Sequence, residues 1–558
     1  MALFAELRRR NVLKVALLYV IAGWLLLWFV LNTGEVLGLP PWADLAVGIA
    51  LLVGFPIALL FAWTYEITPA GLRKAVDVEQ TQSIVYKTGQ KLNAAVAVMA
   101  VLGILALLGE GLMPKFEFLV PGVPEGDAPV SANTPPEIRS LVLDNGLKII
   151  VWPDHDIPNV VMYNYVRAGG RNEYPGITGL SHFFEHMMFL GTDSLEPGEF
   201  DRTMEAAGGS NNAYTSPDVT VYQDWFPRSA LEVIFTIEAD RLENLQTFAD
   251  AVEAERQVVT SERRYWIDDD NSGALEEQMR ATAFVAHPYQ FPVIGWPSDI
   301  ASWTEDDLDN FYRTYYAPNN RTMIFTGDVT AAEIFELSEK YFASIPAQEP
   351  PPPIRTVEPE QQGTRRLAII TPAQTPLLHM AFHAGNATDP QTAPLNLLLE
   401  ILVGGESSRL HRALVEDEEI ALNVSGFQDE GFDPGLAYFY LTLPPGGDPA
   451  LVEQRMLEEL QSVIDNGVTE AELSKARNLT LAAFWRGLST INGKASALGR
   501  HEVFLGDYEA LFTQPQLMES ITVTDLQEAA AIFREENMTV GVLQSPAEQE
   551  AEDEGASE

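Results

Sequence analysis

Hydrophobic and polar residues follow different patterns in different parts of the chain. Near the N-terminus, three uncharged and largely apolar runs cover residues 15–32, 45–65 and 92–109. Each has about the ~20 residues that a helix needs to cross a bilayer. From residue 137 onwards, short alternating segments predict strands, and segments with helical spacing predict amphipathic helices. We therefore expect about three transmembrane helices followed by a larger α/β region.

The region from residue 137 to 346 shows a regular succession of predicted elements. Two alternating segments flank Asp144-Asn145-Gly146, which is the pattern of a β-hairpin. Further strands are expected at 160–168, 211–215 and 219–226, and helices at 180–190, 200–207, 231–245 and 253–264. Because strands and helices alternate, the fold class is expected to be α/β (α+β) with mixed sheets.

Proline-rich and acidic segments divide the chain into expected parts. Four consecutive prolines, Pro350 to Pro353, are typical of a semi-rigid linker between domains. The predicted parts, in chain order, are a membrane region (1–113), an extended linker (114–136), a first α/β domain (137–346), a proline-rich linker (347–363), a second α/β domain (364–545) and an acidic disordered tail (546–558).

A short internal repeat relates the two α/β domains. The first domain ends with Thr304-x-x-Asp307-Leu308, a predicted helix, and a strand that begins at Asn320. The second domain ends with Thr522-x-x-Asp525-Leu526, a predicted helix, and a strand that begins at Asn537. Self-similarity of this kind predicts two domains of related fold.

The distribution of Lys and Arg predicts how the three expected spans lie in the membrane. Basic residues precede the first span and occupy the second loop, whereas the first loop has none. The N-terminus is therefore expected inside, and everything after the third span outside. In a bacterium this arrangement tethers residues 137–545 to the inner membrane on the periplasmic side. If the third run is instead a buried core helix, that region is cytoplasmic; a cleaved signal peptide is the alternative for the first run.

The charge and the absence of cysteine narrow the classes of function. The chain has 35 Lys and Arg against 79 Asp and Glu, a net charge of −44. Such acidity argues against nucleic acid as a partner. Membrane lipid is the partner that the three predicted spans imply. Without Cys, the chain has no disulfide framework, no thiolate metal site and no cysteine nucleophile.

The sequence His182-Phe183-Phe184-Glu185-His186 carries the strongest chemical signal. On a helix, residues four apart lie on one face, so both imidazoles can reach one metal ion. Glu185 falls within the same arc of that face. The order His-x-x-Glu-His is a signature of zinc peptidases. The alternative for the pattern alone is a helix with two incidental surface histidines.

A catalytic zinc site needs a third protein ligand and an open position for water. The predicted helix at 253–264 offers Glu255 and Glu262, which are two turns apart and share one stripe, whereas Glu253 lies on the opposite side. In so acidic a chain, a solvated helix face is the default interpretation of any single glutamate.

The chain resembles the pitrilysin/insulinase family of inverzincin metallopeptidases, in the branch that includes the β-subunit of mitochondrial processing peptidase. The family's third ligand follows the second His by 76 residues, and Glu262 follows His186 by 76. The flanking segments 169–173 and 212–215 also agree. The resemblance covers about residues 137 to 545, and implies two homologous domains that form half of a clam-like chamber, with zinc ligands in the first domain only.

The resemblance also implies a role for each site residue. His182, His186 and Glu262 would bind one zinc ion per chain, and Glu255 would support them from behind. Glu185 would act as the general base that takes a proton from water and later delivers it to the leaving amine. A protein with these residue roles would be a zinc endopeptidase that acts on peptides or unfolded segments.

Substrate contacts and a partner subunit are implied less directly. By resemblance, Asn211, Asn212, Ala213 and Tyr214 lie at the cleft edge and pair with an extended peptide, although an ordinary edge strand is an equal alternative. The family's Arg and Tyr from a C-terminal domain align here with Val415 and Leu422, which cannot donate side-chain hydrogen bonds. We therefore expect a homologous partner subunit that supplies both groups, unless Arg409 or Arg412 substitutes. The alternative function is a non-catalytic scaffold or assembly subunit of the same fold.

Overall fold

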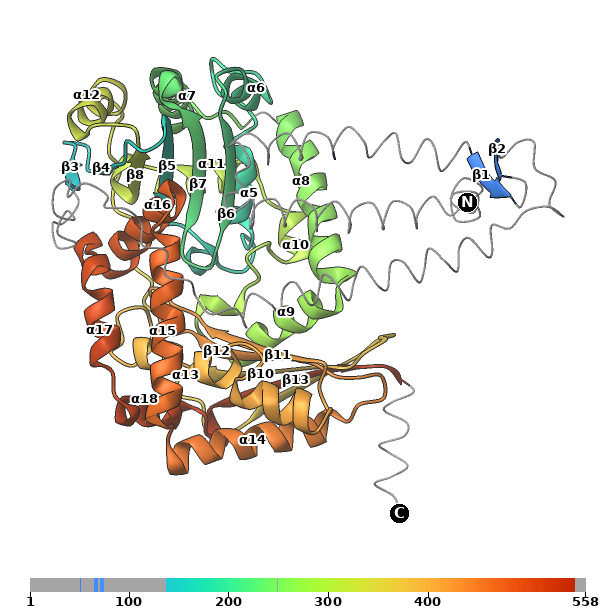
Figure 1. Cartoon of the computed structure of the whole chain (residues 1–558). Helices are drawn as coiled ribbons and strands as arrows, with labels where there is room; N and C mark the ends of the chain where they lie inside the picture. Colours follow the sequence, from blue (N-terminus) through green and yellow to red (C-terminus); the bar gives the residue numbers. More distant parts are fainter. Residues whose placement is uncertain (1–50, 52–64, 69–70, 75–136, 248, 547–558) are drawn as a thin grey trace. The chain divides into compact units, whose positions relative to one another are not determined.

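The computed structural model of the chain describes residue 51 and residues 65–68, 71–74, 137–247 and 249–546 (Figure 1). The chain divides into two compact units, Met1–Ser131 and Ala132–Glu558. In the first unit, β1 (Tyr65–Thr68) pairs antiparallel with β2 (Gly71–Lys74), a hairpin that the sequence patterns did not predict.

The predicted membrane region lies almost entirely outside the described residues. The runs 15–32, 45–65 and 92–109 include only Leu51 and Tyr65 of the described part, so the spans stay a prediction. The linker at 114–136 and the tail beyond residue 546 are likewise outside it. Within the described part of the chain, no helix combines the length and the apolar character that crossing a bilayer requires.

A six-stranded sheet forms the centre of the first half of the second unit. Its order is β3 (Arg139–Val142), β4 (Lys148–Pro153), β8 (Arg321–Gly327), β5 (Asn159–Val166), β7 (Thr220–Pro227) and β6 (Ser210–Thr215). Only β4 and β8 run parallel. The predicted hairpin is confirmed, since β3 and β4 pair across the turn that contains Asp144.

A five-stranded sheet occupies the second half, and it repeats the order of the first. Its strands are β11 (Asn423–Gln428), β12 (Leu436–Thr442), β10 (Leu377–His383), β13 (Met538–Gln544) and β9 (Arg365–Ile370). β13 and β9 are its parallel pair and correspond to β8 and β4. Starting from the β6 edge of the first sheet and the β11 edge of the second, the strands therefore follow one another in the same chain order. The first sheet has one additional strand, β3, at its other edge.

The repeat found in the sequence recurs in matching local contacts. Thr304 and Asp307 form a capping box at the start of one helix, and Thr522 and Asp525 form the same box in the second half. Asn320 donates its amide to two backbone carbonyls before β8, and Asn537 does so before β13. These side chains form hydrogen bonds with backbone groups at helix ends and in turns that would otherwise lack a hydrogen-bond partner.

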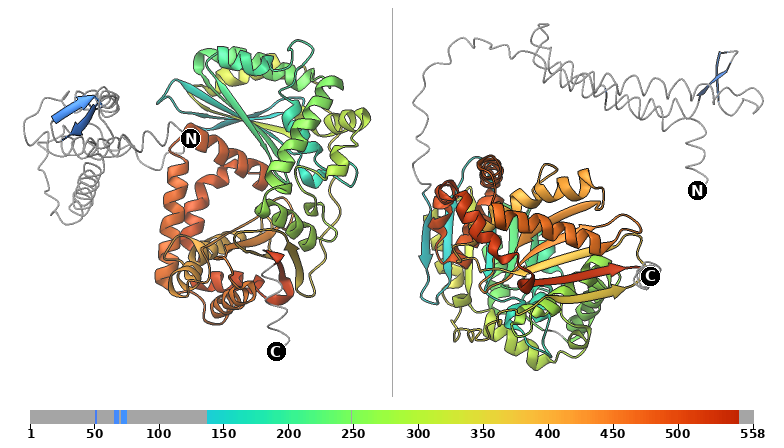
Figure 2. Two further views of the ribbon diagram at one scale, coloured as in Figure 1. Left: turned by 90° about the vertical axis from the view of Figure 1, so that its right-hand side faces the viewer. Right: turned by 90° about the horizontal axis from the view of Figure 1, so that it is seen from below.

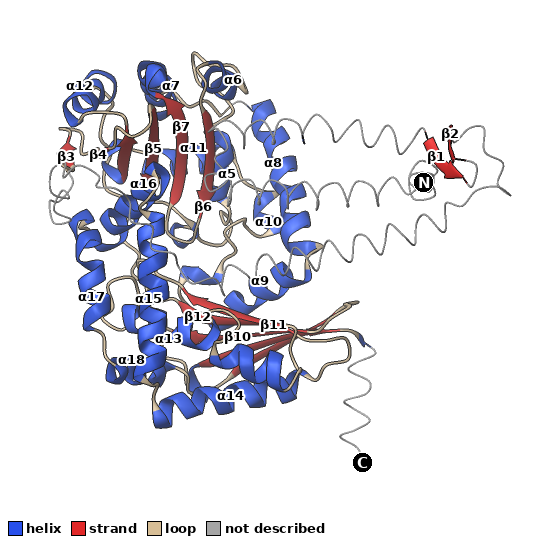
Figure 3. Cartoon of the chain, viewed as in Figure 1, coloured by secondary structure: helices blue, strands red, loops and turns tan. Residues whose placement is uncertain are grey.

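Helices cover both sheets (Figure 3). In the first half they are α5 (Leu180–Met187), α6 (Glu199–Ala206), α7 (Leu231–Glu243), α8 (Ala249–Arg263), α9 (Asn271–Ala283), α10 (Pro297–Ile300), α11 (Glu305–Tyr315) and α12 (Ala331–Phe342). In the second half they are α13 (Thr392–Val403), α14 (Pro449–Asn466), α15 (Glu470–Gly487), α16 (Ile491–Arg500), α17 (Gln514–Ser520) and α18 (Val523–Ala529). The four helices predicted between 180 and 264 are confirmed as α5 to α8, with shifted ends.

Each half contributes one helix that packs on the sheet of the other half. On one face, the first sheet packs on α7 and α12, and on the other face it packs on α16 of the second half through Ala495 and Leu498. Conversely, α9 of the first half packs on the second sheet through Leu275 and Met279. Figure 2 shows how the second half lies against the first through these helices. Because each sheet needs a helix of the other half to cover one face, the halves form one body.

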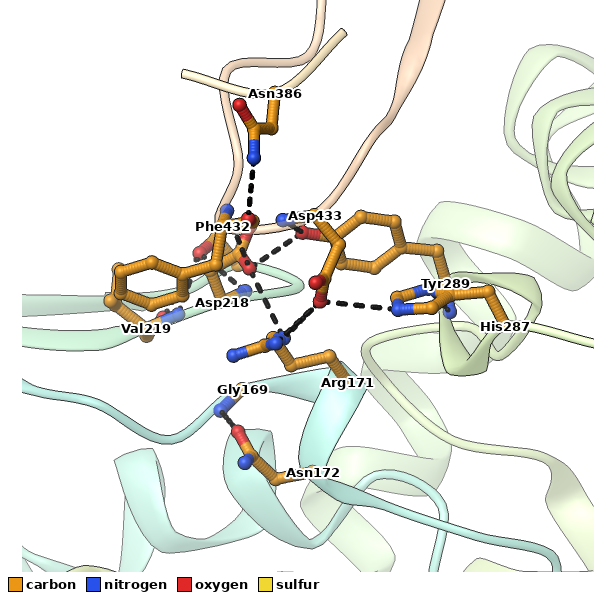
Figure 4. A network of polar contacts seen from close by, with 11 residues as sticks. Gly169, Arg171, Asn172, Asp218, Val219, His287, Tyr289, Asn386, Phe432 and Asp433 are labelled. Carbon is orange, nitrogen blue, oxygen red and sulfur yellow. Dashed lines mark hydrogen bonds and ion pairs between the residues drawn. The ribbon is translucent and has the colours of Figure 1, made fainter. Parts of the chain in front are cut away.

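A buried polar network joins the halves at a second place (Figure 4). Arg171 donates from Nε to Asp433 at 2.8 Å, and its Nε lies 3.6 Å from Asp218. Tyr289 donates its hydroxyl to Asp218 at 2.6 Å, and the ring of His287 lies 3.1 Å from Asp433. Charged groups from both halves are thus paired where water is largely excluded, and such pairs are costly to break singly.

Candidate metal centre

Helix α5 carries both histidines of the His-x-x-Glu-His sequence, and its first turn is held in an unusual way. Gly179 precedes the helix with φ of +89°, and a Cβ there would lie 2.5 Å from the carbonyl oxygen of Ile294. Only glycine fits that position. The buried Glu173 accepts hydrogen bonds from the backbone N–H groups of Gly179 and Ser181, both at 2.7 Å. The side chain of Glu173 therefore caps the helix N-terminus. Burial raises the pKa of this carboxyl group to about 8, although the two N–H donors favour its charged form.

Helix α8 presents its glutamates to α5 because several contacts fix it in place. Arg263, at its C-terminal end, is buried and donates to Glu277 at 2.6 Å and to the carbonyl oxygen of Gly295 at 3.0 Å. Arg256 donates to the carbonyl oxygen of Trp303 at 3.0 Å. The same stripe of the helix then carries both glutamates of the predicted site.

The three predicted ligands converge. Nε2 of His182 lies 3.6 Å from Oε2 of Glu262, and Nε2 of His186 lies 3.4 Å from the same oxygen. The three ligand atoms all lie within 4.8 Å of one another. A tetrahedral zinc ion with bonds of about 2.0–2.2 Å holds its ligand atoms about 3.3–3.6 Å apart. Two of the separations match that geometry.

The surroundings of these atoms also fit a metal. Oε2 of Glu262 is buried and has no hydrogen-bond partner among the described residues, although burial of an unpaired carboxylate oxygen is costly. On the far side of His186, Nδ1 lies 2.7 Å from Oε1 of Glu255. This contact leaves Nε2 free to face Glu262, which is the arrangement of metal-binding histidines that are oriented by a carboxylate. The donor set therefore fits zinc.

The sequence motif places Glu185 beside the cluster, and the fold adds a partner for it. Thr215, at the end of β6, donates its hydroxyl to Oε2 of Glu185 at 2.6 Å. Burial raises the pKa of Glu185, while the bond from Thr215 and the neighbouring His186 act in the opposite direction. A buried carboxylate held in one orientation is suited to exchange a proton with a bound reactant.

The electrostatics of the two histidines differ. Burial and the neighbouring His186 lower the pKa of His182 to about 4. Burial lowers the pKa of His186 as well, but the contacts with Glu255 and Glu262 outweigh it and raise the pKa to about 9. The contact with His186 lowers the pKa of Glu262. Because a metal ion binds neutral imidazole, a divalent cation in this cluster would replace the proton that the contacts with Glu255 and Glu262 favour on His186.

The segment predicted to contact substrate forms the last strand of the first sheet. β6 contains Asn211, Asn212, Ala213 and Tyr214, and among the described strands it has a ladder partner, β7, on one side only. The amide of Asn211 donates to Asp201 at 2.9 Å, so this side chain is engaged within the protein. The other edge of β6 is the kind of backbone to which an extended peptide adds a strand.

The positions aligned with the family's Arg and Tyr lie in the second half. Val415 belongs to a π-helical turn, His411–Asp417, and packs on the hydrophobic core, whereas Leu422 is 53% exposed. Arg409 donates to both oxygens of Glu472, at 2.6 and 2.8 Å. Because this bidentate pair already occupies its guanidinium group, Arg409 is poorly placed to replace the missing arginine. Arg412 is exposed.

Two contributors to the site had no role in the sequence interpretation. Thr215 and Glu173 both lie in segments that agree with the family, but nothing in their spacing shows that one holds Glu185 and the other caps α5. Those contacts join β6 to α5 and a loop to a helix start. Only the folded chain brings them together.

Two family models match the chain. The one described as "Insulinase (Peptidase family M16)" matches residues 154–295, and the one described as "Peptidase M16 inactive domain" matches residues 302–480. The chain belongs to the M16 peptidase family. The two matches cover parts of both halves of this M16 chain, and the resemblance drawn from the motif is confirmed at the level of the family.

Relatives with assigned names support the same placement. The M16 chain is 28% identical over 427 residues to "Zinc protease PqqE" of Helicobacter pylori, a match that covers 74% of this chain and 93% of the relative. It is 24% identical over 412 residues to "Mitochondrial-processing peptidase subunit beta" of Lentinula edodes, covering 72% and 88%. The chain is therefore similar to zinc proteases and has processing-peptidase-like relatives.

Solved structures show the same fold. A crystal structure of a protease from Helicobacter pylori superposes with a TM-score of 0.71 at 27% identity, covering 73% of this chain and 99% of that one. The first half of the periplasmic protease PqqL from Escherichia coli gives 0.61 at 21% identity, covering 75% and 97%. The mixed α/β fold with two sheets thus matches M16 half-chamber structures.

Proposed function

We propose that this M16 chain is a zinc-dependent endopeptidase that hydrolyses peptides or unfolded protein segments, with one zinc ion per chain. The observation that carries the proposal is the convergence of the Nε2 atoms of His182 and His186 on the buried Oε2 of Glu262, which accepts no hydrogen bond among the described residues. Those three atoms would hold the ion. A scaffold subunit has no physical need for this arrangement.

The residues around the ion would divide the chemistry between them. When bound, zinc supplies Lewis-acid chemistry, since it polarises a carbonyl group and lowers the pKa of water to about 7. Glu185 would accept the proton of the attacking water and deliver it to the leaving amine. Thr215 would keep Glu185 in the orientation for both transfers, and Glu255 would keep His186 in place.

The substrate would bind as an additional strand. We infer that the backbone of residues 211–214 pairs with an extended peptide along the open edge of β6. Backbone pairing reads an extended conformation more than particular side chains, so it suits unfolded segments. The peptide would then run past Thr215, which ends the strand and contacts Glu185.

A homologous partner subunit would complete the site. Val415 and Leu422 cannot donate hydrogen bonds to a reacting carbonyl, and Glu472 engages Arg409, so we infer that a partner supplies an Arg and a Tyr. The match to the whole E. coli protease PqqL covers only half of that chain, which shows that the fold can occur as one half of a longer polypeptide.

The location of the site is proposed from the charge pattern alone. Basic residues flank the first and second uncharged runs on the side predicted to be inside. We infer that the N-terminal runs anchor the chain in a bacterial inner membrane, with the peptidase region on the periplasmic side. Two measurements test this arrangement. The protein should stay in the membrane fraction after a wash at high pH, and its peptidase region should be cleaved by protease added to spheroplasts.

The decisive experiment measures zinc content and peptide hydrolysis on the same preparations of the full chain in detergent. About one zinc per chain is expected, with hydrolysis that rises when a homologous subunit is added. Glu185→Gln should keep the zinc and lose the activity by a factor of about 10²–10⁴. Glu253→Gln is the matched control, because this glutamate is on the surface of α8 and pairs with Arg256.

Each alternative gives a different result in that experiment. Zinc without hydrolysis, with any homologous partner, would favour the non-catalytic scaffold. Wild-type activity in Glu185→Gln would remove Glu185 from the mechanism. Full activity of the chain purified alone would refute the need for a partner.

A further inference from the structure

A buried tyrosine of the first sheet holds the backbone of the helix that carries Glu185. The hydroxyl of Tyr222, on β7, donates to the carbonyl oxygen of Phe184 in α5 at 3.0 Å, and Phe184 directly precedes Glu185 in the chain. The same carbonyl oxygen accepts from the N–H of Met188 at 3.2 Å, so Tyr222 adds a second donor to a bond of the helix. Isolated helices as short as α5, which has eight residues, are marginal in water. The helix therefore depends on bonds from its surroundings.

The hydroxyl of Tyr222 is itself held by a neighbour. It lies 3.3 Å from the hydroxyl of Tyr316, and both side chains are buried. Because Tyr222 gives its proton to Phe184, Tyr316 is the donor in this contact. The backbone of Tyr316 is fixed in turn, since Nε of the buried Arg321 donates to its carbonyl oxygen at 3.1 Å. A buried hydroxyl without a partner is costly, so these contacts favour one orientation of Tyr222.

The same face of β7 also contacts the partner of Glu185. Thr220 and Tyr222 are two residues apart on the strand and therefore share a face. Their cross-strand neighbours on β6 are Thr215 and Ala213. The buried Thr220 donates its hydroxyl to the carbonyl oxygen of Ala168 at 3.0 Å, and its Oγ1 lies 3.4 Å from Oγ1 of Thr215. One strand thus fixes both α5 and the end of β6.

We propose that Tyr222 is a positioning residue for peptide hydrolysis, because its hydroxyl holds the turn of α5 that carries Glu185 in register with β6. The inference rests on the proposed function, in which β6 binds the peptide and Glu185 moves the proton. Tyr222 contacts neither the peptide nor the proposed zinc ligands. It acts through the backbone of Phe184 alone.

The expected effect is on the rate of the chemical step. A proton acceptor must lie within hydrogen-bond reach of the attacking water, and a displacement of about 1 Å can lower a rate about 100-fold. Binding of an extended peptide along β6 needs only the backbone of that strand. Loss of the Tyr222 hydroxyl should therefore change kcat and leave KM unchanged, which is the signature of an interaction that acts in the transition state.

Packing of the Phe184 side chain is the competing explanation for the position of α5. The ring of Phe184 lies 5.7 Å from that of Phe311 and 5.2 Å from that of Tyr316, measured between centroids. If these contacts suffice, the hydroxyl of Tyr222 contributes to folding stability and nothing to turnover. Removal of the hydroxyl alone separates the two explanations, because Tyr222→Phe keeps the ring and its packing.

The first measurement compares steady-state hydrolysis of one fluorogenic peptide by wild type and Tyr222→Phe at saturating zinc, in the full chain and with its partner if one is required. Tyr222→Phe should lower kcat by about tenfold, with KM within about twofold of wild type and one zinc per chain retained. Wild-type kcat in Tyr222→Phe would overturn the proposal.

Tyr312→Phe is the matched control. The hydroxyl of Tyr312 donates to the carbonyl oxygen of Leu242 at 3.0 Å, so it also supports a helix backbone, but that helix is α7. The ring of Tyr312 packs on the same hydrophobic core as that of Tyr222. Tyr312→Phe should lower the urea midpoint about as much as Tyr222→Phe and leave kcat unchanged. An equal loss of kcat in both variants would show a general effect of core stability and would overturn the proposal.

A double-mutant cycle tests whether Tyr222 acts through the position of Glu185. Thr215→Val releases Glu185 from its other contact, so the hydroxyl of Tyr222 should then matter little. The double variant is expected to lose about as much kcat as Thr215→Val alone, rather than the roughly 100-fold that two independent tenfold losses would give. Independent losses would show that Tyr222 does not act through Glu185.

Hydrogen–deuterium exchange separates this inference from the proposed function, because it needs no hydrolysis. In the zinc-loaded full chain in detergent, Tyr222→Phe should speed exchange in residues 184–190, whereas Tyr312→Phe should speed it at the C-terminal turn of α7. That result supports the role of Tyr222 in holding α5 even if the chain hydrolyses nothing. Unchanged exchange of residues 184–190 in Tyr222→Phe overturns it even if the chain proves to be a zinc peptidase.

Discussion

Oε1 of Glu255 lies 2.7 Å from Nδ1 of His186, whereas Nδ1 of His182 is buried without a hydrogen-bond partner among the described residues. The two histidines of the motif are therefore held differently. One ring is oriented by a carboxylate, which raises its basicity as a ligand, and the other is oriented by packing within α5. The orientation of His186 thus depends on a single side chain of another helix.

Replacing that carboxylate should weaken zinc binding. Glu255→Gln is expected to lower zinc affinity by about 10–100-fold, because a neutral amide supports the imidazole less than an anion does. Competition with a chelator measures the affinity directly. Glu253→Gln, on the opposite side of α8, should leave it unchanged. Equal affinity in Glu255→Gln and wild type would show that packing alone orients His186.

The hydroxyl of Thr215 should matter for turnover rather than for zinc. Thr215→Val removes the 2.6 Å hydrogen bond to Glu185, and kcat is expected to fall by about tenfold or more, since a hydrogen bond to a charged group contributes about 1.5–3 kcal/mol. Thr215→Ser should restore most of the rate. Steady-state kinetics and zinc content are measured together, and a loss of zinc in Thr215→Val would indicate a structural role instead.

Glu173 should stabilise α5, which carries two of the proposed zinc ligands, from its N-terminus. Glu173→Ala leaves two N–H groups, of Gly179 and Ser181, without their acceptor, and the free energy of unfolding is expected to fall by about 2–4 kcal/mol. Urea unfolding measures the change. Glu173→Gln, which keeps an acceptor oxygen, should lose less. If Glu173→Ala were as stable as wild type, α5 would be held by its packing alone.

Asp218 should make the stability of the interface between the halves depend on pH. Burial raises its pKa to about 6 from the ordinary 3.8, although Tyr289 and Arg171 favour the charged form. Two other groups face Asp218, namely the backbone N–H of Phe432 and the carboxylate of Asp433. The carboxylate of Asp433 also contacts the ring of His287. Burial raises the pKa of Asp433 too, but its bonds from His287 and Arg171 outweigh this effect and lower it.

The direction of this pH dependence follows from the number of protons bound in the folded and unfolded states. Because the folded pKa of Asp218 lies above the unfolded one, the native protein binds more protons between about pH 4 and pH 6, and this group's contribution to the free energy of unfolding falls as pH rises through that window. Asp218→Asn lacks the effect. Its stability relative to wild type should therefore improve by up to about 3 kcal/mol from pH 4 to pH 7, in urea unfolding at a series of pH values.

A surface substitution serves as the control for this pH series. The exposed Asp306→Asn should track wild type throughout the range. If the difference between Asp218→Asn and wild type were independent of pH, Asp218 would carry the same charge in the folded and unfolded states. Its burial between Arg171 and Tyr289 would then be fully compensated.

The sequence by itself predicted most of the elements of the first half and the proposed zinc ligands. Alternation and helical spacing predicted the strands and helices between residues 139 and 264, because local patterns of burial need no tertiary information. The His-x-x-Glu-His spacing places His182 and His186 on one face by helix geometry alone. The distance to Glu262 came from the resemblance to a family, since no local rule links positions 76 residues apart.

Only the tertiary structure decided how these pieces act on one another. That Thr215 holds Glu185 and that Arg171 joins Asp433 are contacts between segments 30 and 262 residues apart along the chain. The exchange of α9 and α16 between the sheets is of the same kind. That Glu173 caps α5 is a contact over six to eight residues, which the conformation of the loop before the helix decides. Sequence patterns report which side of an element is buried, but not which element covers it, because any apolar face can pack against any other of suitable shape.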